Sequence, residues 1–176
     1  MTARPAAIVA ALDFAARKHS AQRRKDAAAS PYINHPIALL HVLSVEAGIA
    51  DEAVLCAALL HDTLEDTATT VTELAEHFGA AICNLVQEVT DDRSLPKDER
   101  KRRQVEHAPR LSPGARLVKL ADKICNLRDL VDNPPADWSL ERKRAYFDWA
   151  GQVVDGVRGS HATLEILFDE VRSRCP

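Results

Sequence analysis

The sequence predicts an all-α fold, in which about eight to ten helices form a bundle in a single domain. Three observations support this prediction. Apolar residues recur every three or four positions along most of the chain, no segment alternates apolar and polar residues as a strand does, and proline and glycine divide the chain into pieces of helix length. The 176 residues are enough to bury a substantial core, so we expect one domain over residues 1–176.

The composition narrows the possible functions. Hydrophobic residues make up 46% of the chain and charged residues 28%, as in an ordinary globular protein, and the net charge of −3 gives no general attraction to nucleic acid or to an anionic membrane. No leader and no apolar stretch of bilayer-spanning length is visible, so we expect a cytoplasmic protein. The four cysteines have no zinc-finger spacing, and three of them lie in apolar helical patterns, where we expect reduced core residues.

The first helix is expected from Pro5 to His19, because apolar residues such as Ile8 and Leu12 share one face. Residues 20–34 show no sustained period and contain Pro31, so they are interpreted as a long loop. Loops of this length in a compact domain are usually functional or disordered.

The second helix is expected over residues 35–48. Proline is favoured at the first helical position, which puts Pro36 there and His35 at or near the N-cap. The third helix is expected over residues 51–62. Its apolar run at positions 54–60 indicates that it is buried on all sides.

Two short helices are expected next, over residues 71–78 and 80–89, with Gly79 between them. Residues 91–96 form a break, and a polar helix starts at Lys97 and ends before Pro109.

Ser112 is expected to cap the following helix and Pro113 to occupy its first position. Apolar residues at helical spacing over 115–127 indicate that this helix is largely buried. The last two helices are expected over residues 140–154 and 161–172.

The pair His61-Asp62 follows the buried run 54–60 directly. A neutral imidazole and a carboxylate offer one nitrogen and one oxygen donor to the same divalent cation. A His-Asp pair alone is a weak signal, because a helix end with a solvated acidic tail looks the same. The buried run favours a metal site, since an unpaired charge at the edge of a core is costly. On a continuous helix, Glu65 and Asp66 would lie one turn further on and close to that metal.

His35 and Asp122 are the candidates for further metal ligands. Asp122 interrupts an apolar segment, and a carboxylate in such surroundings needs a cation as a partner. That partner is either a metal ion or the side chain of Lys119, Lys123 or Arg128, and both alternatives stay open. For His35 the alternative is an N-cap imidazole that bonds backbone N–H groups.

Two imidazoles and two carboxylates, without thiolate, favour an open octahedral ion such as Mn²⁺ over structural zinc. A divalent cation lowers the pKa of the water that it binds and so supplies a nucleophile at neutral pH. Glu65 and Asp66 would then orient or deprotonate that water, or protonate a leaving group.

Basic residues gather at positions 23–25, 97–103 and 142–144, which suggests an anionic substrate. A solvated helix face is the better explanation of most of the second and third groups, but it explains Arg24 and Lys25 less well, since they lie in the loop that leads to His35.

Two further side chains are candidates for substrate contacts. Asn126 lies four residues after Asp122 on the same helix face, where its amide would hydrogen-bond a sugar or a base. Tyr146 would stack on or hydrogen-bond a substrate, although a core aromatic residue at that spacing is more common.

These motifs together resemble those of HD-domain phosphohydrolases, and specifically of the small alarmone hydrolases similar to the metazoan SpoT homologue and to the hydrolase half of RelA/SpoT proteins. The resemblance covers nearly the whole chain, with every motif in the same order. The matching segments are residues 22–26, 31–36, 61–67, 90–97, 119–130, 146 and 149–150.

The resemblance implies Mn²⁺-dependent release of the 3′-pyrophosphate of (p)ppGpp, the stringent-response alarmone, to give GDP or GTP. It also implies a role for each matching residue. The implied metal ligands are His35, His61, Asp62 and Asp122. The residues implied to act on the attacking water are Glu65 and Asp66. The implied substrate contacts are Arg24, Lys25, Lys97, Asn126 and Tyr146. At this length we expect no synthetase domain.

One departure from the family pattern concerns the loop before Pro31. Related sequences usually carry glycine there, whereas this chain has Asp26, three alanines and Ser30. Because every residue other than glycine restricts the backbone torsion angles, this departure puts the closure of the loop over a ligand in question.

Two other functions stay open. One is an enzyme of the same fold that acts on another nucleotide, for example on the 2′-phosphate of NADPH. The other is a non-catalytic nucleotide-binding module, against which the presence of Glu65 and Asp66 argues. In each case we expect a small-molecule nucleotide as the partner, with neither a nucleic acid polymer nor a membrane. The oligomeric state is left open, with a homodimer among the options.

Overall fold

The computed structural model describes residues 5–176, and over that range the chain is all-α, as predicted. A π-helix (Val42–Glu46) continues α2, and a short 3-10 helix (Ala108–Arg110) follows α6. No helix within residues 5–176 is long and apolar enough to cross a membrane. The α-helices are α1 (Pro5–Lys18), α2 (Asn34–His41), α3 (Glu52–Leu60), α4 (Thr63–Asp66), α5 (Val71–Val89), α6 (Lys97–His107), α7 (Pro113–Asp132), α8 (Leu140–Asp155) and α9 (Ala162–Arg172).

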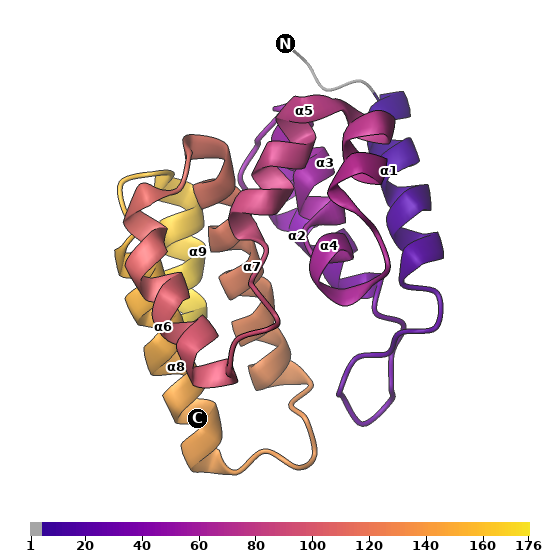
Figure 1. Ribbon diagram of the computed structural model, residues 1–176. Helices are drawn as coiled ribbons and strands as arrows, with labels where there is room; N and C mark the ends of the chain where they lie inside the picture. Colours follow the sequence, from indigo (N-terminus) through magenta and orange to yellow (C-terminus); the bar gives the residue numbers. More distant parts are fainter. Residues whose placement is uncertain (1–4) are drawn as a thin grey trace.

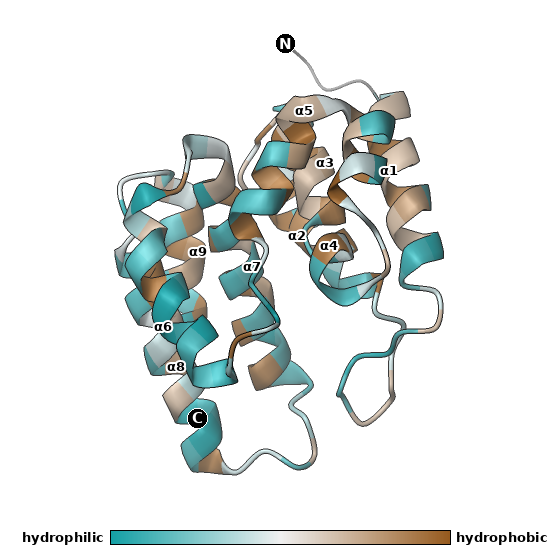
Figure 2. Ribbon diagram, in the orientation of Figure 1, coloured by the Kyte–Doolittle hydropathy of each residue, from teal (hydrophilic) through white to brown (hydrophobic). Residues whose placement is uncertain are grey.

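Helix α7 lies in the middle of the molecule, with α1–α5 on one side and α6, α8 and α9 on the other (Figure 1). It is buried over much of its length because it packs against helices of both groups. Hydrophobic residues concentrate on α3 and on the inner faces of its neighbours, whereas α6 is mostly hydrophilic and covers the outside (Figure 2).

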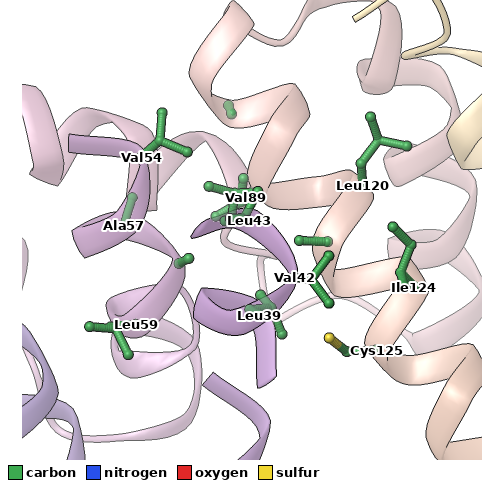
Figure 3. Packing of buried hydrophobic residues seen from close by; sticks show 14 of the residues in the cluster. Leu39, Val42, Leu43, Val54, Ala57, Leu59, Val89, Leu120, Ile124 and Cys125 are labelled. Atoms are coloured by element: carbon green, nitrogen blue, oxygen red, sulfur yellow. The ribbon is translucent and has the colours of Figure 1, made fainter. Parts of the chain in front are cut away.

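The core joins α2, the π-helix, α3 and α7. Leu39 and Leu43 lie between Leu59 of α3 and Ile124 of α7 (Figure 3). All four are fully buried, and burial of such a side chain stabilises the fold by about 1.5–3 kcal/mol. In α3 every residue from 54 to 60 is buried, so this helix ends inside the protein and not at its surface.

The predicted helix ends are largely confirmed. Asp51 caps α3 by accepting hydrogen bonds from two backbone N–H groups of the first turn, and Ser112 caps α7 in the same way, through one N–H group. The two helices predicted on either side of Gly79 are the two halves of α5, which kink at that glycine (φ 79°) because only glycine adopts this angle without strain.

The start of the second helix differs from the prediction. Helix α2 begins at Asn34, one residue earlier than expected, so His35 lies inside the first turn and not at the N-cap. A turn over residues 31–35 is the reason: the N–H of Asn34 donates to Pro31 O and that of His35 to Tyr32 O. The His35 ring is thereby directed inward, with 4% of the residue exposed.

Candidate metal centre and its cavity

The four predicted metal ligands converge at the junction of α2, α3 and α7. One donor atom each of His35, His61 and Asp62 lie within 4.8 Å of one another. Oδ1 of Asp122 lies 3.3 Å from Nε2 of His35 and 4.0 Å from Nε2 of His61. Residues from three distant parts of the chain thus bring two imidazoles and two carboxylates to one point.

His61 is held with one ring nitrogen available for a cation. Its Nδ1 lies 2.9 Å from the carbonyl oxygen of Ala58, which only accepts hydrogen bonds, so Nδ1 carries a proton. The other nitrogen, Nε2, is buried, forms no hydrogen bond and lies 2.9 Å from Oδ2 of Asp62. Although burial lowers the pKa of His61, the charges of Asp62 and Asp122 raise it to about 9. A divalent cation fits this position in place of the proton.

Asp122 forms the lysine ion pair that was one of the two alternatives considered for it, and it also faces the two histidines. Its Oδ2 accepts a hydrogen bond from Nζ of Lys123 (3.0 Å), while Oδ1 faces the histidines and accepts a bond from Asn126 (2.6 Å). Burial would raise the pKa of Asp122, but the charge of Lys123 holds it well below its usual range. An ion pair on one oxygen and a metal ion near the other are compatible, because a carboxylate has two oxygens.

The chain does not carry His61 and Asp66 on one continuous helix, contrary to the expectation from helical spacing. Helix α3 ends at Leu60 and α4 begins at Thr63. The turn nevertheless persists, since the N–H of Asp66 donates to the carbonyl oxygen of Asp62 at 2.8 Å. Both acidic side chains of α4 therefore stay beside the His-Asp pair.

Glu65 has the environment of an acid–base group. Its carboxylate accepts hydrogen bonds from the backbone N–H of Asp91 (3.2 Å) and from Arg100 (3.4 Å), and 16% of the side chain is exposed. Burial and then the charge of Asp91 raise the pKa of Glu65 to about 7. Asp66 accepts a hydrogen bond from Gln22 at 2.8 Å.

A cavity of about 500 Å³ opens beside the metal centre, and we call it the substrate cavity. Four of the five residues predicted to contact substrate line it. Lys97, the fifth, is exposed at the start of α6 and is not among the lining residues. The four predicted substrate contacts that line the cavity are Arg24, Lys25, Asn126 and Tyr146.

Two residues at this site, Tyr32 and Asp129, were not singled out from the sequence. The hydroxyl of Tyr32 donates to Asp62, and Arg24 forms an ion pair with Asp129. Tyr32 lies in the matching segment 31–36 together with His35, and this proximity to a predicted metal ligand was the signal that could have indicated it. Nothing local links Arg24 to Asp129, because they lie 105 positions apart in the chain.

Comparison with known proteins gives close matches. The family described as HD domain matches residues 11–146. The guanosine-3′,5′-bis(diphosphate) 3′-pyrophosphohydrolase MESH1 of Homo sapiens is 59% identical over 165 residues, which cover 94% of this chain and 92% of that protein. The protein of the same name from Drosophila melanogaster is 54% identical over 91% of this chain and 89% of its own length.

A solved structure is similar over nearly its whole length. It is described as a metazoan ortholog of SpoT that hydrolyzes ppGpp and plays a role in starvation responses. The two chains superpose with a TM-score of 0.93 at 51% sequence identity, and the match covers 97% of this chain and 96% of that one.

Proposed function

This chain belongs to the HD domain family, and from that premise we propose that it is a metal-dependent hydrolase that releases the 3′-pyrophosphate of (p)ppGpp. The observation that carries the proposal is the buried cluster of two imidazoles and two carboxylates beside a cavity that basic residues line. Relatives that are more than half identical over nearly the whole chain bear the name of this activity.

The residues present fit a divalent cation. The ligands would be His35, His61, Asp62 and Asp122, and we propose Mn²⁺ because mixed nitrogen and oxygen donors without thiolate suit it. When bound, this ion supplies Lewis acidity at a phosphoryl oxygen and a lowered pKa of water.

The proposed role of Glu65 is to accept and return a proton. Water adds to the phosphorus that carries the 3′-oxygen, the bond between that phosphorus and the 3′-oxygen breaks, and pyrophosphate leaves. Glu65 takes the proton of the water and returns one to the 3′-oxygen of the nucleotide. A pKa of about 7 allows both directions near neutral pH. Asp66, held by Gln22, orients the water.

Substrate binding is assigned to the basic and polar residues of the cavity. Arg24 and Lys25 supply positive charge for the phosphates, and Asn126 and Tyr146 contact the nucleoside. Lys97 would have to reach the phosphates from outside the cavity lining, so its role is the least supported of the five.

The test is a comparison of kcat/KM on ppGpp and on NADPH with the purified, Mn²⁺-loaded protein, with products separated by anion exchange. We expect GDP and pyrophosphate from ppGpp, at a higher kcat/KM than phosphate release from NADPH. Asp66→Asn should lower the rate strongly, whereas Asp13→Asn, a change at an exposed aspartate of α1, should leave the rate unchanged. Intact ppGpp together with turnover of NADPH would replace the proposed substrate.

The cytoplasmic location stays a prediction, and a homodimer stays one of the options for the oligomeric state.

A further inference from the structure

Arg93 lies on the loop between α5 and α6, at the edge of the substrate cavity. Its Nη2 is 2.9 Å from Oδ1 of Asp66, and its Nε is 3.6 Å from Oε1 of Glu65. The two carboxylates are mostly buried, with 16% of Glu65 and 14% of Asp66 exposed, whereas 57% of the arginine side chain is exposed. A solvated cation thus covers the two carboxylates assigned to the attacking water.

Neither carboxylate depends on Arg93 alone. Glu65 also accepts a hydrogen bond from the N–H of Asp91, and the second oxygen of Asp66 accepts one from Gln22. If Arg93 turned away, both buried charges would therefore keep a partner and would not incur the cost of an unsatisfied group. Because 57% of the Arg93 side chain is exposed, water and salt also screen its two ion pairs and weaken them. The arginine is held loosely enough to exchange its partners for another anion.

An anionic substrate needs a cation on this wall of the cavity. A pyrophosphate group that approaches Glu65 and Asp66 is repelled by both carboxylates unless positive charge lies between them. Arg24 and Lys25 also line the cavity, but the ion-pair partner of Arg24 is Asp129, whereas Arg93 is the cavity-lining cation that is paired with Asp66. A guanidinium group matches phosphate geometry, because it donates two parallel N–H bonds to two oxygens.

We propose that Arg93 is a further substrate-binding residue, which exchanges Glu65 and Asp66 for the pyrophosphate group of the substrate. The exchange neutralises the incoming charge and at the same time uncovers the two carboxylates when substrate is present. This inference rests on the proposed function, because it takes the substrate to carry a pyrophosphate group.

The experiment compares Arg93→Ala and Arg93→Lys with Arg17→Ala. Arg17 is a matched control, since it is 68% exposed, pairs with a carboxylate of its own helix at 3.0 Å and does not line the cavity. Two experiments use Mn²⁺-loaded protein: steady-state kinetics give KM and kcat for ppGpp, and calorimetry gives the Kd of inorganic pyrophosphate. The calorimetric experiment requires no turnover.

Loss of a charge-assisted contact should raise both the KM for ppGpp and the Kd of pyrophosphate in Arg93→Ala by about 10- to 100-fold. Arg93→Lys, which keeps the charge but not the paired N–H groups, should lie between Arg93→Ala and wild type, and Arg17→Ala should match wild type. A lower kcat with unchanged KM and Kd would mean that Arg93 only positions the carboxylates, and the inference would be wrong.

The two proposals fail in different ways. Wild-type protein that binds pyrophosphate through Arg93 but leaves ppGpp intact would overturn the proposed function and keep the arginine contact. Turnover of ppGpp with identical constants in the Arg93 and Arg17 variants would overturn only the contact. Wild-type protein that neither binds pyrophosphate nor turns over ppGpp would overturn both.

Discussion

Replacement of Glu65 by glutamine should abolish turnover and at the same time stabilise the metal-free protein at alkaline pH. The folded chain raises the pKa of this carboxyl from 4.5 to about 7, through burial and the nearby charge of Asp91. Ionised Glu65 therefore costs the folded state about 3 kcal/mol. Glutamine has a similar shape and never ionises. Its single oxygen can accept the hydrogen bond from the N–H of Asp91, whereas its NH2 group replaces the oxygen that faces Arg100.

The pH dependence of the stability difference between Glu65→Gln and wild type follows from the raised pKa of Glu65 in the folded chain. Below about pH 4.5 Glu65 is protonated in both the folded and the unfolded chain, so the variant and the wild type should be equally stable. Between pH 4.5 and 7 the unfolded chain loses this proton first, which favours unfolding of the wild type. Above pH 7 the difference should reach its full size, at most about 3 kcal/mol.

The assay is urea unfolding of Glu65→Gln and wild type in EDTA, at steps from about pH 4.5 to about pH 8.5, with turnover of ppGpp measured separately in Mn²⁺. Glu76→Gln, a change at an exposed glutamate of α5, is the control and should show no such trend. A free energy of unfolding that is equal to or lower than that of the wild type at about pH 8, or a difference that does not change with pH, would refute the reasoning.

The remaining predictions concern the acid limb of the rate profile, the loop and the metal. Asp91→Asn removes the charge that helps to raise the pKa of Glu65, so the acid limb of kcat against pH should move to lower pH; an unchanged limb would exclude Glu65 as the titrating group. Ala29 has a left-handed backbone (φ 47°), so Ala29→Gly should raise the free energy of unfolding by about 0.5–1 kcal/mol in a urea titration, and a decrease would contradict this. His61→Ala should lose metal binding by elemental analysis, and full occupancy would remove His61 from the ligand set.

The sequence predicted the helices well because their signals are local. The apolar run at 54–60 and the cap and proline at 112–113 each depend on neighbouring residues, and both predictions are confirmed. The break at His61 was missed for the opposite reason: helical spacing alone does not reveal that α3 stops at Leu60 and that a separate turn, α4, follows.

The site was less accessible from the sequence, since much of it depends on contacts between distant segments. The motifs indicated Arg24 but not its ion pair with Asp129, and they indicated Glu65 but not the backbone N–H of Asp91 that holds it. The loop before Pro31 lacks the usual glycine, and the structure shows the consequence as the left-handed torsion angle of Ala29. Local rules predict that a left-handed position favours glycine, but they do not identify which residue of this loop adopts the left-handed conformation.

The most direct test of the central claim is a titration of EDTA-stripped protein with Mn²⁺, in which bound metal and conversion of ppGpp to GDP and pyrophosphate are followed together. We expect activity to rise in proportion to metal bound at a single site and to be absent from Asp122→Asn, which weakens that site. Turnover by the stripped protein, or by Asp122→Asn at wild-type rates without bound metal, would contradict the account.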